Sequence, residues 1–189
     1  MVQGRIQTPS SGALHLVNGF TSHGLDTNNN LLFDLAVKLL YLSLDNPLDL
    51  FHGQTRNFMD ELRTFGFEMV SCRQAVEMDL AIGLTRRPLR VGDALRILEV
   101  MDAYEIRLLS LNSRDLLLLV NEYLWEMSLK FGDLLHYAGA TLLNADYLSS
   151  WNTDDFNERT EDSINNVNVR RGLKTIRVGT PNMILRWLQ

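Results

Sequence analysis

The sequence predicts an α/β protein in three layers, with a central, mainly parallel sheet of five strands and helices on both faces. Three observations predict it. Short apolar segments alternate along the chain with longer segments of helical spacing. Of the 189 residues, 46% are hydrophobic, which is enough for one well-buried domain. Charged residues make up 22%, as in an ordinary folded protein.

Five segments have the length and apolar character of strands. They are residues 12–20, 66–71, 105–111, 145–151 and 173–179. Strands that alternate with helices form parallel sheets covered on both faces. Sites in such sheets lie beyond the carboxyl ends of the strands, so the polar residues that follow each strand are the candidate functional residues.

Helices are predicted between these strands. The apolar segment 31–44 is interpreted as a buried helix, with Asp34 as a structural residue in its first turns. Asn112 is predicted to cap the helix that follows it, and Thr180 with Pro181 predicts the start of the last helix. The other predicted helices are 55–65, 72–84, 87–104, 113–127, 130–143 and 182–188.

Composition narrows the functional classes. The formal net charge is -5, whereas nucleic-acid-binding domains are usually basic, although a carboxylate-rich metal site also makes the charge more negative. The single cysteine, Cys72, excludes an intrachain disulfide and is interpreted as a small buried residue. We find no pattern of a signal peptide or a membrane span, so we expect a soluble, cytoplasmic protein without membrane contact.

Acidic residues accompany several of the predicted strand ends. Asp26 precedes the segment 31–44, Glu77 lies in the helix after strand 66–71, and Asp133 lies near the start of a later helix. Asp154 and Asp155 follow strand 145–151. We therefore expect acids from separate segments to meet at one edge of the sheet.

Four segments resemble a known family. They are LDTNNNLL at 25–32, VSCRQAVEMDL at 70–80, LKFGDLLHYAGATLLNADYLSSWNTDDF at 129–156 and INNVNVRRGLKTIRVGTPNMIL at 164–185. With them, residues 26–189 resemble a PIN domain, the fold of the VapC-type toxin ribonucleases. The resemblance implies a five-stranded parallel sheet and a metal-dependent endoribonuclease. We expect residues 1–20 to form a flexible extension and residues 21–189 to form the PIN-like nuclease domain.

The resemblance also implies roles for individual residues. The family's first three acids match Asp26, Glu77 and Asp133. The usual fourth acid falls at Asn152, so either Asp155 or Asp154 is expected to supply the missing carboxylate. The family further implies RNA as the substrate, an antitoxin as a partner, and a homodimer.

Phosphodiester cleavage explains why these residue types are needed. Mg²⁺ or Mn²⁺ activates a water molecule and stabilises the charged transition state, and such hard cations prefer oxygen ligands. Asn152 could orient a ligand or water, and Thr27 and Ser150 could hydrogen-bond a carboxylate or phosphate. Arg170 and Arg171 are candidates for neutralising the RNA backbone, as are Arg86, Arg87, Arg90 and Lys174.

The candidate residues also have purely structural interpretations. Any one of the acids could be a helix cap or a surface charge, and His136, one turn after Asp133, fits a core or rim residue. Tyr123, Trp125 and Tyr137 have the spacing of core or dimer-surface residues. A PIN-like binding module without catalysis is the alternative function. A nucleotide-binding domain of flavodoxin type lacks support, because the chain contains no phosphate-binding glycine-rich loop.

Overall fold

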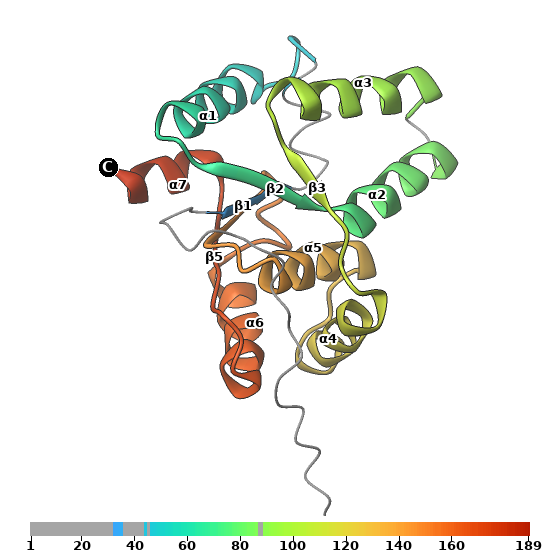
Figure 1. Cartoon of the computed structure of the whole chain (residues 1–189), viewed down its shortest axis with the longest axis vertical. Helices are drawn as coiled ribbons and strands as arrows, with labels where there is room; N and C mark the ends of the chain where they lie inside the picture. The colour runs from blue at the N-terminus through green and yellow to red at the C-terminus, as the bar shows by residue number, and fades with distance from the viewer. Residues whose placement is uncertain (1–31, 36–43, 45, 87–88) are drawn as a thin grey trace, which may run out of the picture.

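The computed structural model describes residues 32–35, 44, 46–86 and 89–189. Helices and strands alternate along these residues (Figure 1). The elements are β1 (Leu32–Leu35), α1 (His52–Thr64), β2 (Glu68–Cys72), α2 (Arg73–Arg86), α3 (Val91–Ala103), β3 (Arg107–Leu109), α4 (Ser113–Glu126), α5 (Phe131–Leu142), β4 (Tyr147–Ser149), α6 (Glu158–Arg171), β5 (Arg177–Gly179) and α7 (Pro181–Leu188).

The described strands form one sheet in the order β3-β2-β1-β4-β5, and every pairing in it is parallel. The chain proceeds outwards from β1 to β3, returns to the other side of β1, and proceeds outwards again to β5. The strand order therefore reverses between β1 and β4. In parallel sheets such a switch point leaves a crevice at the carboxyl ends of the strands, where ligands bind. The α/β class predicted from the sequence is confirmed.

Helices cover both faces of the sheet (Figure 1). Consecutive residues of β2 point to opposite faces, so Val70 belongs to a core formed with α4, α5 and α6, and Met69 to a core formed with α1, α3 and α7. Helix α2 contributes to both cores, with Ala75 in the first and Val76 in the second. This arrangement leaves the strand ends as the places where polar side chains can collect.

Four helices pass into the following strands through a residue in the left-handed backbone conformation. These residues are Gly66, Glu105, Asn144 and Gly172, with φ of 75°, 58°, 57° and 68°. In each case this residue and the next one donate their backbone N–H groups to carbonyls of the helix that has just ended. The turns at this edge of the sheet are therefore short and fully hydrogen-bonded.

The structure corrects the prediction for residues 31–44. Residues 32–35 form β1 instead of a helix, because they pair with strands on both sides, and a central parallel strand is as continuously apolar as a buried helix. Asp34 is thus a strand residue whose Cα pairs with Val70 and Leu148. The predicted strand 12–20 and the extension 1–20 lie outside the described residues.

Two predicted caps are confirmed, and one helix was not predicted. The side chain of Asn112 accepts hydrogen bonds from two N–H groups of α4, and Thr180 caps α7 with Pro181 in its first turn. Helix α6 was left unassigned because its segment, ERTEDSINNVNVRR, is rich in polar residues and asparagine, which are weak helix formers. Its ends nonetheless carry clear signals, with Asn157 as the N-cap and Gly172 as the C-cap.

The left-handed turns generate a stability prediction. Replacing Glu105 by glycine should raise the free energy of unfolding by about 0.5–1 kcal/mol, because a non-glycine residue is strained at positive φ. Asn144→Gly is the matched control and should gain less, since asparagine tolerates this conformation. Urea unfolding of both variants measures the difference. A loss of stability in the Glu105→Gly protein would contradict the prediction.

Candidate functional site

The candidate site is organised by α5. Residues Leu134 to Thr141 of this helix are all buried, and the helix contacts α2, α4 and strands β1, β2 and β4. Asp133 lies in its first turn, and His136 and Tyr137 follow three and four residues later. Residues at this spacing share one face of a helix. That face therefore presents a carboxylate, an imidazole and a phenol together.

Helix α2 contributes a second carboxylate. It begins immediately after β2, and Asp79 lies two turns into it. The Oδ2 atom of Asp79 is 3.0 Å from Nε2 of the buried His136. The Oδ1 atom lies against the first turn of α5, only 3.5 Å from the point where a Cβ on Gly132 would be. Asp79 is therefore held beside the helix that carries Asp133.

The connection 150–157 after β4 contributes a third carboxylate. The hydroxyl of Tyr137 donates a hydrogen bond to the carbonyl of Asp155 at 3.1 Å, and the Tyr137 ring stacks on Phe156 with centroids 4.9 Å apart. The Asp155 carboxylate accepts a hydrogen bond from Asn152 Nδ2 at 2.9 Å and lies 3.6 Å from Nζ of Lys130. Its side chain is 20% exposed. Helix α5 thus fixes the position of this acid as well.

The three carboxylates influence one another. Burial raises the pKa of Asp133, and the negative charges of Asp155 and, to a lesser extent, Asp79 raise that pKa further. The nearby His136 and Lys130 oppose this rise. Crowded carboxylates repel one another, and a bound cation relieves that repulsion. Burial and these like charges therefore disfavour the ionised form of Asp133 in the folded protein.

The structure does not bring Glu77 to these acids, so its expected place in the site is corrected. Glu77 is 64% exposed and lies 3.9 Å from Arg73, one turn earlier on α2. Residues two positions apart in a helix are separated by about 200° around its axis. Glu77 and Asp79 therefore point to nearly opposite sides of α2. Asp79, and not Glu77, lies beside the first turn of α5.

The two alternatives for the fourth acid differ in position. Asp154 is exposed, whereas Asp155 faces Asn152 and Lys130. Asn152 was predicted to orient a ligand, and its amide holds the Asp155 carboxylate. The hydroxyl of Ser150 is buried and accepts a hydrogen bond from the Asn152 backbone, so it stabilises the turn instead of facing a substrate.

One other group of predicted residues does not reach the acids, and another group lies outside the described residues. Arg170 and Arg171 lie in the last turn of α6 and form ion pairs with Glu126 and Glu122 of α4. Helix α6 starts beside the 150–157 connection and is roughly 20 Å long, so its last turn is far from Asp155. Asp26 and Thr27 lie outside the described residues.

Sequence reasoning missed Asp79 and Lys130 and interpreted His136 as a core or rim residue. Asp79 could not be preferred over Glu77, because both are helical acids after the same strand and only the orientation of α2 distinguishes them. Lys130 lies directly before α5 and shows no motif. Asp34 was assigned to a helix, whereas its strand register pairs it with Val70 and Leu148, which both belong to the core packed against α5.

The donor set determines which metal could bind. Within the described residues, no three histidine, cysteine or acidic side chains are grouped closely enough to hold an ion. Asp133 and Asp155 alone suit Mg²⁺, which keeps several water ligands and needs only one or two carboxylates. The hydroxyl of Ser149, at the end of β4, is buried and has no hydrogen-bond partner among these residues, so a polar group is available beside the switch point.

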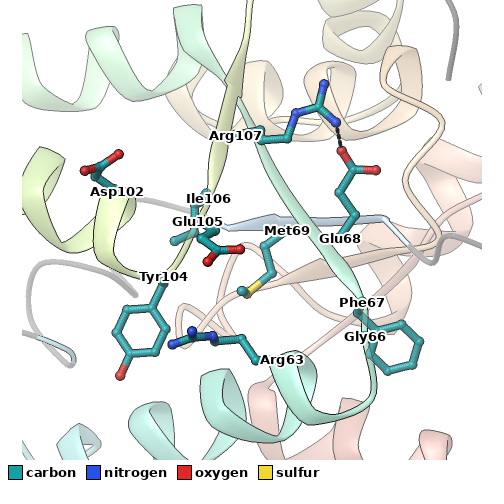
Figure 2. A pocket seen from close by; sticks show the side chains of 10 residues that line it. All are labelled: Arg63, Gly66, Phe67, Glu68, Met69, Asp102, Tyr104, Glu105, Ile106 and Arg107. Atoms are coloured by element: carbon teal, nitrogen blue, oxygen red, sulfur yellow. Dashed lines mark hydrogen bonds and ion pairs between the residues drawn. The ribbon is translucent and has the colours of Figure 1, made fainter.

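A pocket of about 820 Å³ lies at the opposite edge of the sheet, at the amino ends of β2 and β3 (Figure 2). Some of its polar groups contact one another: Arg107 pairs with Glu68, and the Arg63 guanidinium lies 5.9 Å from the centre of the Tyr104 ring. None of the acids of the candidate site lines this pocket, and we assign the pocket no part in that site.

A scan of protein-family models and a search of curated proteins each found no match to this chain. The likeness to PIN domains therefore rests on the sequence segments quoted above. Among the described helices, none is long and apolar enough to cross a membrane.

The electrostatics of Asp133 generate a prediction. Because its pKa is raised in the folded protein, the folded state binds this proton more tightly than the unfolded state does. Metal-free Asp133→Asn should therefore be more stable than the wild type at pH 7. The advantage should shrink as the pH falls through the raised pKa, where the wild-type carboxyl also becomes neutral.

Thermal unfolding in EDTA at several pH values measures this difference. Glu77→Gln is the matched control, because Glu77 is exposed and away from the other acids. Two results would contradict the prediction: an Asp133→Asn protein that is less stable than the wild type at pH 7, or a stability advantage of the variant that grows on acidification. Either result would show that repulsion among the carboxylates does not destabilise the folded protein.

Proposed function

We propose that this chain is a PIN-like endoribonuclease that hydrolyses RNA phosphodiester bonds with Mg²⁺ or Mn²⁺. The single observation that carries the proposal is the convergence of Asp79, Asp133 and Asp155 from three separate elements. His136 and Tyr137 hold Asp79 and the segment of Asp155 against the face of α5 that carries Asp133, whose pKa is raised by burial first and then by these acidic neighbours. The parallel sheet and its switch point support the same conclusion, because such folds bind ligands beyond the carboxyl strand ends.

Each residue has a role in this proposal. Asp133 and Asp155 hold the metal ion, and Asn152 orients the Asp155 carboxylate. The ion, when bound, would lower the pKa of a water molecule and stabilise charge on the phosphate. His136 positions Asp79 beside the first turn of α5. Lys130 is 82% exposed and neutralises Asp155 until a cation replaces it.

Asp34 is the further residue to test. Its backbone lies in the central strand, one residue before the end of β1, and its register partners Val70 and Leu148 pack on the α5 side of the sheet. This place beside the switch point makes Asp34 an alternative to Asp26 as the first acid of the PIN resemblance.

A PIN-like module that binds RNA or protein without cleaving is the second candidate. Two observations favour it: an amide, Asn152, stands where the family has an acid, and no three described ligands are grouped for a metal. The toxin role and its antitoxin partner are expectations from the resemblance, and we propose them on that basis alone.

Cleavage of mixed single-stranded RNA, with Mn²⁺ and with EDTA, tests the proposal. Asp133→Asn and Asp155→Asn should lose more than the roughly 10–100-fold that changes beyond the direct ligands produce. Asp154→Asn and Glu77→Gln are the matched controls and should retain activity, because both acids are exposed. Asp34→Asn in the same series decides whether that residue belongs to the site.

The outcomes separate the two candidates. RNA binding without Mn²⁺-dependent cleavage, and without thermal stabilisation by Mn²⁺, would support the binding module. Cleavage that is equal in wild type and Asp133→Asn would refute the assignment of Asp133 and with it the proposed nuclease site.

A further inference from the structure

The pocket at the amino ends of β2 and β3 has the size and lining of a small-molecule site (Figure 2). Its volume of about 820 Å³ lies within the roughly 300–1,000 Å³ that such sites occupy. Met69 and Ile106 line it with apolar surface, and both belong to the core beneath, at 3% and 6% exposure. The half-buried rings of Phe67 and Tyr104 add aromatic surface. A ligand there meets an apolar surface that packing already holds in place.

The charged residues of this pocket are only partly paired. Arg107 forms an ion pair with Glu68, so these two charges cancel. Within the described residues, Arg63, Asp102 and Glu105 form no ion pair with one another or with any other side chain. In Figure 2 the Asp102 side chain points away from the Arg63 guanidinium, whereas the Glu105 carboxylate points into the pocket. The pocket therefore offers one cationic and one anionic group to a ligand.

Glu105 keeps its carboxylate there against the preference of its backbone. It is one of four left-handed residues at the helix-to-strand turns, and the other three are Gly66, Asn144 and Gly172. Glycine and asparagine accept positive φ at little cost, whereas glutamate is strained there. Strained residues are frequent at ligand sites, where the use of the side chain offsets the strain. The only charged residue among these four turns thus lines the pocket.

We propose that this pocket binds a free α-amino acid with a large apolar or aromatic side chain. Arg63 pairs with its carboxylate, because a guanidinium binds a carboxylate through two parallel hydrogen bonds, and Glu105 pairs with its ammonium group. The side chain of the ligand packs against Met69 and Ile106. The inference is independent of the proposed nuclease activity.

The balance of charge selects this class of ligand over others. Three carboxylates and two arginines line the pocket, which disfavours a nucleic acid or another polyanion. The terminal residue of a peptide carries only one of the two charged groups, whereas a free amino acid carries both on one carbon atom. An amino acid therefore uses both unpaired groups of the pocket and its apolar surface together.

NMR of the methionine methyl groups, with L-phenylalanine as the probe, tests the proposal. The Met69 signal should shift saturably at millimolar L-phenylalanine, because this side chain lines the pocket. The Met127 signal should not shift, because Met127 packs against the other core. L-Phenylalaninamide lacks the carboxylate and N-acetyl-L-phenylalanine lacks the ammonium group. Each should bind about tenfold more weakly, as expected for the loss of one charge-assisted contact.

Variants assign each charge of the ligand to a residue. Glu105→Gln should weaken L-phenylalanine binding about tenfold and abolish the preference over the N-acetyl derivative, and Arg63→Gln should do the same for the amide. Glu105→Gly should also lose binding while becoming more stable, so unfolding does not explain the loss. Asp102→Asn is the matched control and should bind like the wild type, because Asp102 points away from Arg63.

Several outcomes would overturn the proposal. One is the absence of a saturable Met69 shift, and another is equal binding of L-phenylalanine and both derivatives. A third is an unchanged preference among the three probes in Glu105→Gln and Arg63→Gln. Tighter binding of the amide than of the free amino acid would identify a peptide amino terminus as the ligand instead. None of these measurements involves RNA or a metal ion, so they do not depend on the nuclease proposal.

Discussion

The candidate site depends on the burial of α5. Neighbouring helices and strands enclose this helix, so its axis and rotation are fixed by packing. One face carries Asp133, His136 and Tyr137, and each of the last two holds another segment: His136 contacts Asp79, and Tyr137 binds the connection that contains Asp155. Three carboxylates that are distant in sequence therefore come together through a single helix, and loosening α5 would disperse all of them at once.

Bringing these acids together opposes folding, and the surrounding residues offset part of that cost. Desolvation and like charge raise the pKa of Asp133, which means that its ionised form is disfavoured in the folded protein. Lys130 and the amide of Asn152 both stabilise the Asp155 carboxylate. The buried hydrogen bonds among Tyr123, Thr141 and Asn168 join α4, α5 and α6 near the C-terminal end of α5, about two turns from Asp133. This network contributes stability that offsets the repulsion among the acids of the candidate site.

The sequence predicted the α/β class because alternation of short and long apolar segments is a property of the whole chain, and it placed Asp133 in the first turn of its helix. It did not distinguish β1 from a helix, since a central parallel strand and a buried helix are both continuously apolar. It also chose Glu77 over Asp79, and that choice depends on the rotation of α2 against α5, which no local pattern encodes. Helix α6 went unassigned because its signals lie only at its ends, in Asn157 and Gly172.

The two edges of the sheet differ in a way that explains where function can reside. At the amino edge, left-handed turns connect helices to strands through residues 65–67, 104–106, 143–146 and 172–176, and their hydrogen bonds leave little freedom. At the carboxyl edge, the longest connection that follows a strand within the described residues is 150–157, after β4, one of the two strands that flank the switch point. Because β2 passes directly into α2, the Asp79 side is rigid, while the 150–157 connection has the length needed to turn Asp155 back towards α5. The hydrogen-bonded turns of the amino edge and the longer connection after β4 at the carboxyl edge are therefore the reason for placing the candidate site at the carboxyl edge.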